Sequence, residues 1–438
     1  MRRHGALGRP LTLVALALAA PRAASVWAAE MVEAVVGYRA RPAVVMIGVT
    51  VGATVQVRCG GGEVVTVHAA PSGWIGSGAI IHPDGWVVTN GHVVQPYVEQ
   101  NDAQYLPTLL ERAVAQACQP ALRGLAGDAR AARIRALATD PANRRGITLE
   151  KKLQVTLANG KTYPAEVKTY SPPAFMTVGT TKDPVGAVHT EYGKDVAILK
   201  FEGKDLPVVR LAEDSRRLHL GDEVVVAGYP GVVAAHELLS QATRFLPSMT
   251  FGRVSSFRID VGGHSVIQTD AAIIQGNSGG PVFSLAGEVI GVATFTSFQG
   301  DQVVQGFNFL IPVETLAEAA RKAGVTPQPD SAFMRLWNRG ITLYQTGRYR
   351  RALALFEAAD RMHPGFVELE RIREDVKAQL ENQALLDREG TRWSLAGVGL
   401  LVTICLVWFG GRWASAALDR RIDRAVRKAV QEGGPGAR

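Results

Sequence analysis

The feature that most constrains this chain is the string Gly276-Asn-Ser-Gly-Gly-Pro281, which follows the apolar run Ala271–Ile274. Glycines on both sides of Ser278 allow a tight turn in which successive backbone N–H groups point the same way. Such donors stabilise negative charge developing on a carbonyl oxygen, and losing one typically costs about 10²–10³ in rate. The string therefore predicts a reactive serine at the end of a buried strand.

Two further segments offer partners for this serine. His92 follows the second strand of a predicted hairpin, whose apolar runs flank the turn Pro83-Asp84-Gly85. Asp195 stands directly before the apolar run Val196–Leu199, where an unpaired carboxylate would be costly. Taken singly, each also fits an ordinary role, as a surface or core histidine and as an aspartate that caps a loop.

The three residues occur in the order His, Asp, Ser, which is the order of chymotrypsin-type hydrolases. A serine hydroxyl is a weak nucleophile and needs an adjacent base. We expect His92 to take the proton of Ser278 and return it to the leaving amine. We expect Asp195 to hold the imidazole tautomer and to stabilise its charged form.

These strings resemble those of the HtrA/Deg branch of trypsin-like serine peptidases. The matching segments are GSGAIIHPDGWVVTNGHVV, KDVAILK, VVAGYPG, QTDAAIIQGNSGGPVFSLAGEVIGV and GFNFLIPV, within about residues 40–315. The resemblance implies a mainly β, chymotrypsin-type fold of two six-stranded antiparallel barrels with the active site between them. It also implies oxyanion-hole amides from Gly276 and Ser278, protein or peptide substrates, and no cofactor or metal.

One departure concerns activation. In digestive trypsin-like enzymes an aspartate precedes the nucleophile and pairs with the N-terminus that zymogen cleavage creates. This sequence has Asn277 at that position, which carries no charge and cannot form the ion pair. Our hypothesis is that substrate or a partner orders the loop and so switches on activity.

The resemblance also places a specificity pocket. Ala272 stands at its base, six residues before Ser278, and Thr294, Thr296 and Gln305 surround its wall. Because no charged residue stands at the base, selection of Lys or Arg is not expected. We predict a small or modestly apolar side chain before the cleaved bond.

The two ends read as targeting segments. Residues 1–28 combine basic residues, the apolar run Leu11–Ala20 and small residues before a cleavage site, as in a secretory signal peptide. An uncleaved signal anchor is the alternative. Residues 393–411 carry no charge over 19 residues, which is about 28 Å of helix and close to the thickness of a bilayer core. A buried core helix is the alternative.

The basic tail, residues 412–438, indicates topology. The positive-inside rule places it in the cytoplasm, so the part before the span would be periplasmic and the protein would sit in the bacterial inner membrane. The tail forms either an amphipathic helix on the inner leaflet or a solvated extension.

The predicted peptidase domain, residues 29–324, carries an insertion at about residues 96–146. Its apolar spacing predicts helices, which would serve as a lid or docking arm, or as a helical hairpin without a function of its own. Cys59 and Cys118 could pair in an oxidising compartment, but the sequence gives no distance between them. Neither cysteine has a companion at metal-ligand spacing.

After the linker, residues 331–389 read as a helical segment with one tetratricopeptide-like repeat where many HtrA relatives carry a PDZ domain. Its small and aromatic positions are Gly340, Gly347, Tyr349, Ala352, Leu353, Phe356, Ala359 and Pro364. A single repeat buries too little surface to be stable alone, so it must pack on the peptidase, on a second copy or on a partner. It is either a docking module for substrates or adaptors, or a stalk above the bilayer.

The composition excludes some classes of protein. The 438 residues are 47% hydrophobic and 20% charged, which excludes a disordered chain. The net charge of +8 includes no basic block in the globular part, so nucleic acid is not an expected partner. We predict a membrane-tethered serine endopeptidase, with homo-oligomerisation left open. The alternatives are a catalytically latent scaffold that binds partners through the helical repeat, and an esterase or acyl-transfer enzyme with the same triad.

Overall fold

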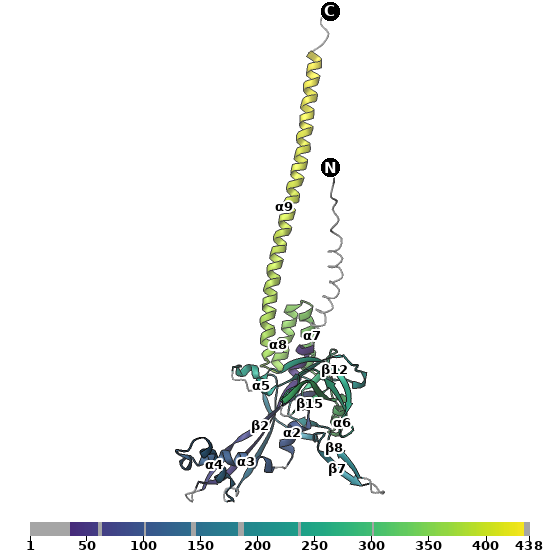
Figure 1. The fold of residues 1–438 in the computed structure, drawn as a ribbon. Coiled ribbons are helices and arrows are strands. Elements are labelled where there is room, and N and C mark those ends of the chain that lie inside the picture. Colours follow the sequence, from purple (N-terminus) through teal and green to yellow (C-terminus); the bar gives the residue numbers. More distant parts are fainter. Residues whose placement is uncertain are drawn as a thin grey trace, which may run out of the picture. The chain divides into compact units, whose positions relative to one another are not determined.

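The computed structural model describes residues 36–59, 64–99, 102–141, 146–182, 188–234, 238–299 and 302–432 (Figure 1). The predicted signal peptide, residues 1–28, lies outside these ranges. The chain forms two compact units, Met1–Ile372 and Arg373–Arg438. The first unit contains both barrels and the helix pair that follows them.

The first barrel is a sheet in the order β5-β4-β1-β2-β3-β9-β6. The strands are β1 (Val44–Arg58), β2 (Val64–His82), β3 (Trp86–Thr89), β4 (Thr148–Thr156), β5 (Thr162–Pro164), β6 (Glu166–Ser171) and β9 (Val196–Lys200). Only Ala165 separates β5 from β6, and its N–H donates to the Leu153 carbonyl at 3.0 Å. One bent strand thus occupies both edges and closes the sheet.

The second barrel has the order β10-β15-β14-β11-β12-β13-β16, and β15 also pairs with β16. The strands are β10 (Arg210–Leu211), β11 (Glu223–Gly228), β12 (Ser248–Ile259), β13 (Ser265–Thr269), β14 (Pro281–Ser284), β15 (Glu288–Gln299) and β16 (Gln302–Pro312). The β15–β16 pairing closes the ring, so the expected pair of barrels is present.

Alternation along the strands builds the cores. In β1 buried and partly exposed residues alternate over most of its length, as expected for a strand with one face inward. A shared core joins the barrels, with Ile81 and Ile198 from the first, Val225 and Phe283 from the second, and Leu316 from α6 (Val313–Lys322). This shared core fixes the junction where the predicted site residues lie.

Strands β1 and β2 continue beyond the first barrel and carry the insertion. The predicted helical segment contains α3 (Leu106–Ala117) and α4 (Gly127–Thr139), with short 3-10 turns at Asp102–Gln104 and Pro120–Leu122. The extended hairpin and α3 share a small separate core. A Cys59–Cys118 disulfide joins the end of β1 to the end of α3, which decides the pairing that the sequence leaves open.

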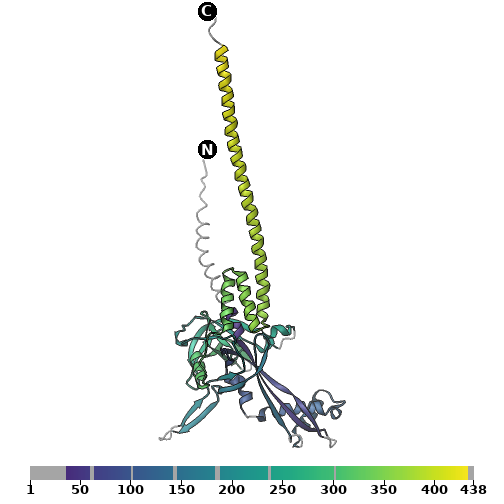
Figure 2. The same ribbon diagram turned by 180° about the vertical axis from the view of Figure 1, so that it is seen from behind.

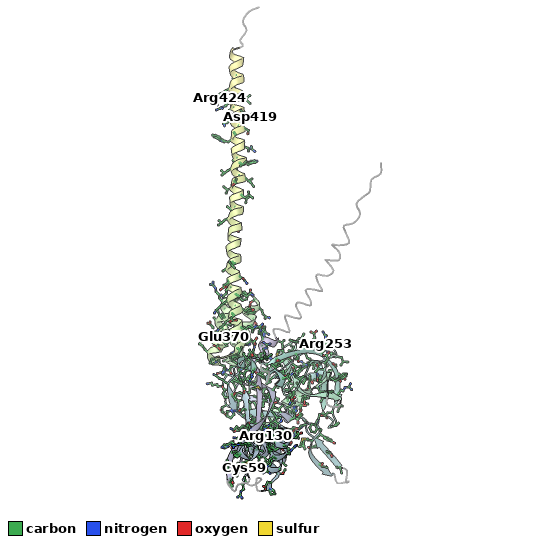
Figure 3. The ribbon with its side chains drawn as sticks, turned by 60° about the vertical axis from the view of Figure 1, so that its left-hand side comes forward. Cys59, Arg130, Arg253, Glu370, Asp419 and Arg424 are labelled. Carbon is green, nitrogen blue, oxygen red and sulfur yellow. A yellow bond between two sulfur atoms is a disulfide. The ribbon has the colours of Figure 1, made fainter. Side chains whose placement is uncertain are left out.

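A second projection is the hairpin of β7 (Thr177–Lys182) and β8 (Val188–Tyr192). Figures 1 and 2 show that it and the insertion leave the barrels on different sides. Figure 3 labels Cys59 at the outer end of the insertion. The remaining short helices are α2 (Gly91–Val98), α5 (Gly231–Ala234), and 3-10 turns at Arg41–Ala43, Ser215–Arg217 and Gln241–Phe245.

The helical segment begins with the pair α7 (Ala332–Gln345) and α8 (Tyr349–Met362). The helices cross closely at Gly340, where a Cβ atom would lie 2.6 Å from Phe356 Cε1. Trp337 is fully buried, packs edge-on against Phe356, and donates from Nε1 to the Tyr38 carbonyl at 2.8 Å. The pair therefore packs on the N-terminal segment of the same chain.

Helix α9 (Val367–Glu432) is the last element. Its first turn stays with the barrels, because Glu368 pairs with Arg41 at 2.8 Å. Further along, the stretch Gly397–Arg424 is long and apolar enough to cross a membrane, with a mean hydropathy of 1.5. The sequence places the span at residues 393–411, and the two ranges overlap.

Candidate active site

The acid and the base are brought together by two neighbouring strands. His92 is the second residue of α2, which begins just after β3, and Asp195 directly precedes β9. Because β3 and β9 pair antiparallel with Thr89 opposite Ala197, the end of one strand and the start of the other lie at the same edge. Strand pairing thus brings together two residues that are 103 positions apart.

The contact between His92 and Asp195 is extensive. Nδ1 of His92 lies 2.9 Å from Oδ2 and 3.0 Å from Oδ1 of Asp195, and the backbone N–H of His92 donates to Oδ1 at 2.8 Å. The carboxylate therefore requires the tautomer with hydrogen on Nδ1, which leaves Nε2 free to accept a proton. This is the orientation that a general base needs.

Asp195 has an unusual backbone that its neighbours hold in place. Its φ is +50°, a conformation that few non-glycine residues adopt. Its N–H donates to the Pro172 carbonyl at 2.8 Å, and its own carbonyl accepts from Asn90 Nδ2 at 2.9 Å. Backbone strain of this kind costs about 1–3 kcal/mol and persists where surrounding contacts over-determine the geometry.

Burial and pairing shift the pKa of His92 in opposite directions, and the same holds for the pKa of Asp195. Burial alone lowers the pKa of His92, but the charge of Asp195 and the hydrogen bond to it outweigh this, so the pKa is raised from 6.5. Burial raises the pKa of Asp195, whereas the charge of His92 and hydrogen bonds from His92 and Thr294 lower it, and the net shift is downward. The acid therefore stays ionised while the base titrates.

The loop of the nucleophile runs between β13 and β14. Gly276 and Gly279 have φ values of +99° and +81°, which glycine adopts without strain, and a Cβ on Gly276 would lie 2.3 Å from the Tyr229 carbonyl oxygen. The Ser278 carbonyl accepts from the Ser77 N–H at 2.8 Å. The loop is thereby fixed against β2.

The hydrogen bond of the Ser278 hydroxyl differs from the expected bond to His92. Its Oγ donates to the Thr294 carbonyl at 3.1 Å, and among the described residues no hydrogen bond joins it to His92. Thr294 in turn donates from Oγ1 to Asp195 Oδ2 at 2.5 Å. Thr294 therefore contacts both Ser278 and Asp195.

The sequence analysis places Thr294 in the wall of the specificity pocket. In the structure its side chain is 3% exposed, and its hydroxyl donates to the Asp195 carboxylate. Ala272 is exposed between β13 and β14, and its carbonyl accepts from Thr250 Oγ1 at 2.7 Å. The side chains of Thr296 and Gln305 lie outside the described part of the structure, so the pocket remains a prediction.

Ser77 is a site residue that the sequence analysis missed. Its fully buried hydroxyl donates to the Gly276 carbonyl at 2.6 Å and accepts from the Tyr229 N–H at 2.8 Å. Together with its N–H bond to Ser278, this makes Ser77 the link between β2 and both ends of the reactive loop. The Ser between two glycines in GSGAII is the signal that could have indicated it.

Asn277 lies between the two loop amides and is 2% exposed. Its Oδ1 atom is buried and has no hydrogen-bond partner among the described residues. The position that pairs with an N-terminal ammonium in zymogen-activated enzymes is thus occupied by a neutral, unsatisfied amide. Within the described ranges, no group of three or more His, Cys, Asp or Glu side chains could hold a metal ion.

Two barrels with a buried aspartate paired to a half-buried histidine, and with a glycine-flanked serine at their junction, are the arrangement typical of trypsin-like serine peptidases. Residues 76–292 match the family model described as a trypsin-like peptidase domain. The match begins just before Ser77 and includes all three predicted catalytic residues. Residues 76–292, just under half of the chain, are therefore similar to a trypsin-like peptidase domain.

Curated relatives include a probable periplasmic serine endoprotease, DegP-like, of Pseudomonas putida (strain GB-1), 36% identical over 140 residues, or 31% of this chain and 26% of the relative. Serine endoprotease DegS of Haemophilus influenzae is 32% identical over 132 residues, or 29% of this chain and 36% of the relative. The alignments thus span about a quarter to a third of these relatives.

Among solved structures, the HtrA-type protease AlgW with tripeptide is 22% identical, with 66% of this chain and 62% of that chain covered and a TM-score of 0.38. The same protease with decapeptide is 21% identical, with 66% and 67% covered and a TM-score of 0.39.

Proposed function

We propose that this protein is a serine endopeptidase of the bacterial envelope that hydrolyses peptide bonds of unfolded or regulatory proteins. The observation that most supports this proposal is the contact of His92 Nδ1 with both carboxylate oxygens of Asp195, together with the glycine-flanked Ser278. The printed names of the DegP-like and DegS relatives support serine endoprotease activity, and the name of the DegP-like relative supports the periplasmic compartment.

The proposed reaction proceeds through an acyl-enzyme. The Ser278 hydroxyl turns from the Thr294 carbonyl to His92 Nε2, attacks the scissile carbonyl and gives its proton to the imidazole. The amides of Gly276 and Ser278 stabilise the resulting oxyanion. His92 then protonates the leaving amine as the C–N bond breaks, and water, deprotonated by the same imidazole, releases the acyl group from Ser278.

Activation would depend on the loop and not on a new N-terminus. The neutral Asn277 and the bond from Ser278 to Thr294 both fit a resting arrangement. Substrate in the cleft would compete for the Thr294 carbonyl and favour rotation of the Ser278 hydroxyl toward His92. N-terminal trimming at the barrel start is accordingly not expected to raise activity by orders of magnitude.

We further propose that α9 anchors the enzyme in the inner membrane. The apolar stretch Gly397–Arg424 and the arginines at and beyond its end support a single span with a cytoplasmic tail. The signal sequence would then export the peptidase domain to the periplasm. The helix pair α7–α8, read as a tetratricopeptide-like repeat, would serve as a docking module for an adaptor or substrate.

The test is hydrolysis by the full chain in detergent micelles, with casein and with matched peptide and ester substrates. We expect casein to be cleaved and the cleavage to disappear in Ser278→Ala, while Ser284→Ala on β14 remains active. Absence of cleavage under all conditions would favour the latent scaffold. Ester turnover without peptide turnover would favour an esterase.

A further inference from the structure

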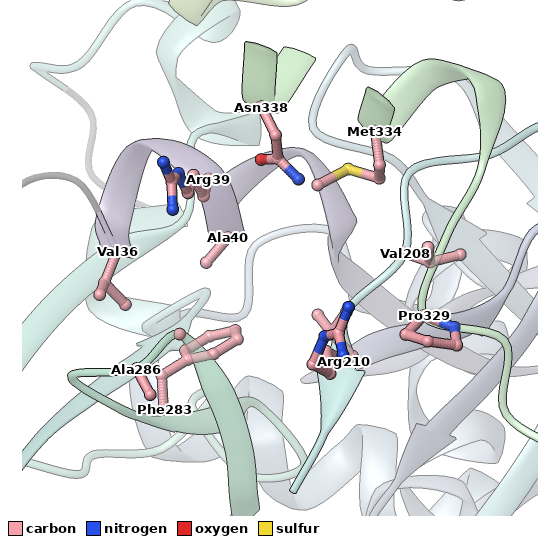
Figure 4. A pocket seen from close by; sticks show the side chains of 12 residues that line it. Val36, Arg39, Ala40, Val208, Arg210, Phe283, Ala286, Pro329, Met334 and Asn338 are labelled. Carbon is pink, nitrogen blue, oxygen red and sulfur yellow. The ribbon is translucent and has the colours of Figure 1, made fainter. Parts of the chain in front are cut away.

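A cavity separate from the active site lies where the N-terminal segment, the second barrel and α7 meet (Figure 4). Its volume is about 230 Å³, and residues far apart in the sequence line it. This is below the roughly 300–1,000 Å³ typical of pockets for drug-sized ligands. The cavity is therefore suited to a small group or to a single residue of a longer chain.

Two arginines give the cavity a positive charge. Arg39 and Arg210 approach it from different elements, as Figure 4 shows, and among the described residues no acidic side chain lines it. In the described part of the chain, Arg39 donates to a neutral group, the Thr342 hydroxyl at 3.3 Å. Glu288 lies opposite Arg210 in the β10–β15 pairing, but within the described ranges neither arginine forms an ion pair. Two exposed guanidinium groups at one cavity, neither in an ion pair with a described residue, favour an anionic ligand.

The other lining groups restrict the ligand further. The Oδ1 atom of Asn338 is buried and accepts no hydrogen bond from any described residue, so it needs a donor. Phe283, Met334 and Val36 are buried apolar side chains in the same lining. The complementary ligand thus carries a negative charge, an N–H or O–H donor, and an apolar group.

We propose that this cavity binds the C-terminal residue of a peptide or protein. The terminal carboxylate would pair with Arg39 and Arg210, the main-chain N–H would donate to Asn338, and the side chain would pack on Phe283 and Met334. Inorganic phosphate would match only the arginines, because it has no apolar group for the remaining wall. The proposal does not depend on peptidase activity. It assigns a ligand of defined chemistry to the cavity beside α7.

The experiment uses the full chain in detergent micelles with Ser278→Ala, so that no peptide is consumed. The probe is a fluorescein-labelled hexapeptide ending in leucine, with either a free C-terminal carboxylate or a C-terminal amide, followed by fluorescence anisotropy. We expect saturable binding of the acid, and binding of the amide weaker by about tenfold or more, because charge-assisted hydrogen bonds are lost. This comparison requires no change to the cavity itself.

Variants then locate the binding. Arg210→Gln and Arg39→Gln should each weaken binding of the acid about tenfold, whereas Arg339→Gln, on the exposed face of the same α7, should leave it unchanged. Equal affinity for acid and amide, or binding that survives both cavity substitutions, would overturn the proposal. So would the absence of saturation at about 1 mM peptide. Competition with inorganic phosphate and with acetyl-leucine is the last comparison. If phosphate displaces the labelled peptide at the same concentration as acetyl-leucine does, the cavity binds anions in general and the proposal is wrong.

Discussion

At the residue scale, the site depends on a few polar atoms that the fold holds in unfavourable surroundings. Asp195 is buried and has a positive φ, yet its carboxylate receives hydrogen bonds from His92 and from Thr294. A buried carboxylate without such partners would be neutral or would destabilise the fold. The same hydrogen bonds keep the imidazole in one orientation.

The first prediction concerns pH. A general base works only when neutral, and pairing with Asp195 raises the pKa of His92 above 6.5. The rate of Ser278 acylation by a fluorophosphonate should therefore rise with pH through a midpoint above 6.5 and level off on the alkaline side. A rate that is constant down to pH 5, or a midpoint below 6.5, would show that His92 is not the base.

The second prediction concerns Ser77. Ser77→Ala removes the bonds to the Gly276 carbonyl and the Tyr229 N–H, which frees the oxyanion loop. Leaving buried groups unsatisfied costs about 1–3 kcal/mol, so we expect kcat to fall about 10- to 100-fold with little change in KM. Ser215→Ala, another buried serine whose hydroxyl bonds Glu314, is the matched control. If kcat is unchanged in Ser77→Ala, or falls equally in Ser77→Ala and Ser215→Ala, Ser77 does not position the loop.

At the scale of elements, the insertion is a small substructure of its own. The extended β1–β2 hairpin and α3 bury a separate apolar cluster that includes Val55, Leu109 and Val114. The Cys59–Cys118 disulfide ties the end of β1 to the end of α3 over a separation of 59 residues. A few apolar contacts and one covalent link thus hold the insertion on the barrel.

We therefore expect Cys118→Ser to destabilise the insertion. A disulfide that closes a loop of this length contributes about 4 kcal/mol in the chain-entropy description. Limited proteolysis should cut residues 102–141 much faster in Cys118→Ser than in wild type, while the barrels remain intact. Cys405→Ser serves as the control. If both variants resist protease equally, the disulfide does not hold the insertion.

Much of this architecture could be predicted from the sequence, and the limits have physical reasons. Alternating apolar runs and glycine turns predict strands, and motif order brings His92 toward Asp195. The role of Ser77 depends on a contact between β2 and a loop 199 positions later, which no local pattern encodes. The hydroxyl of Thr294 could point to either face of β15, and the sequence does not decide which. The Cys59–Cys118 distance is likewise a tertiary property.

At the scale of the whole molecule, the two barrels, the helix pair and the first turn of α9 are joined by side-chain contacts. The barrels share one core, the helix pair is attached through Trp337 to Tyr38, and the first turn of α9 is attached through Glu368 to Arg41. Two helices alone bury little surface, and here the N-terminal segment supplies a further surface for the α7–α8 pair to pack on. The helix pair is therefore expected to unfold together with the barrels.

Trp337→Ala tests this coupling. Removing a fully buried tryptophan typically costs about 3–5 kcal/mol, and here it also leaves the Tyr38 carbonyl without its donor. We expect a lower Tm for the barrels and the helix pair together in differential scanning calorimetry. A separate low-temperature transition, with the main transition unchanged, would show that the helix pair is an independent unit. Trp408→Ala, in the proposed span, is the control.

The most direct test maps the covalent adduct formed when the full chain reacts with a fluorophosphonate, by intact mass and peptide mapping. If Ser278 is the nucleophile and His92 its base, each chain carries one phosphonyl group, on Ser278, and His92→Ala abolishes its formation. An adduct on a different serine, or undiminished labelling of Ser278 in His92→Ala, would contradict the account.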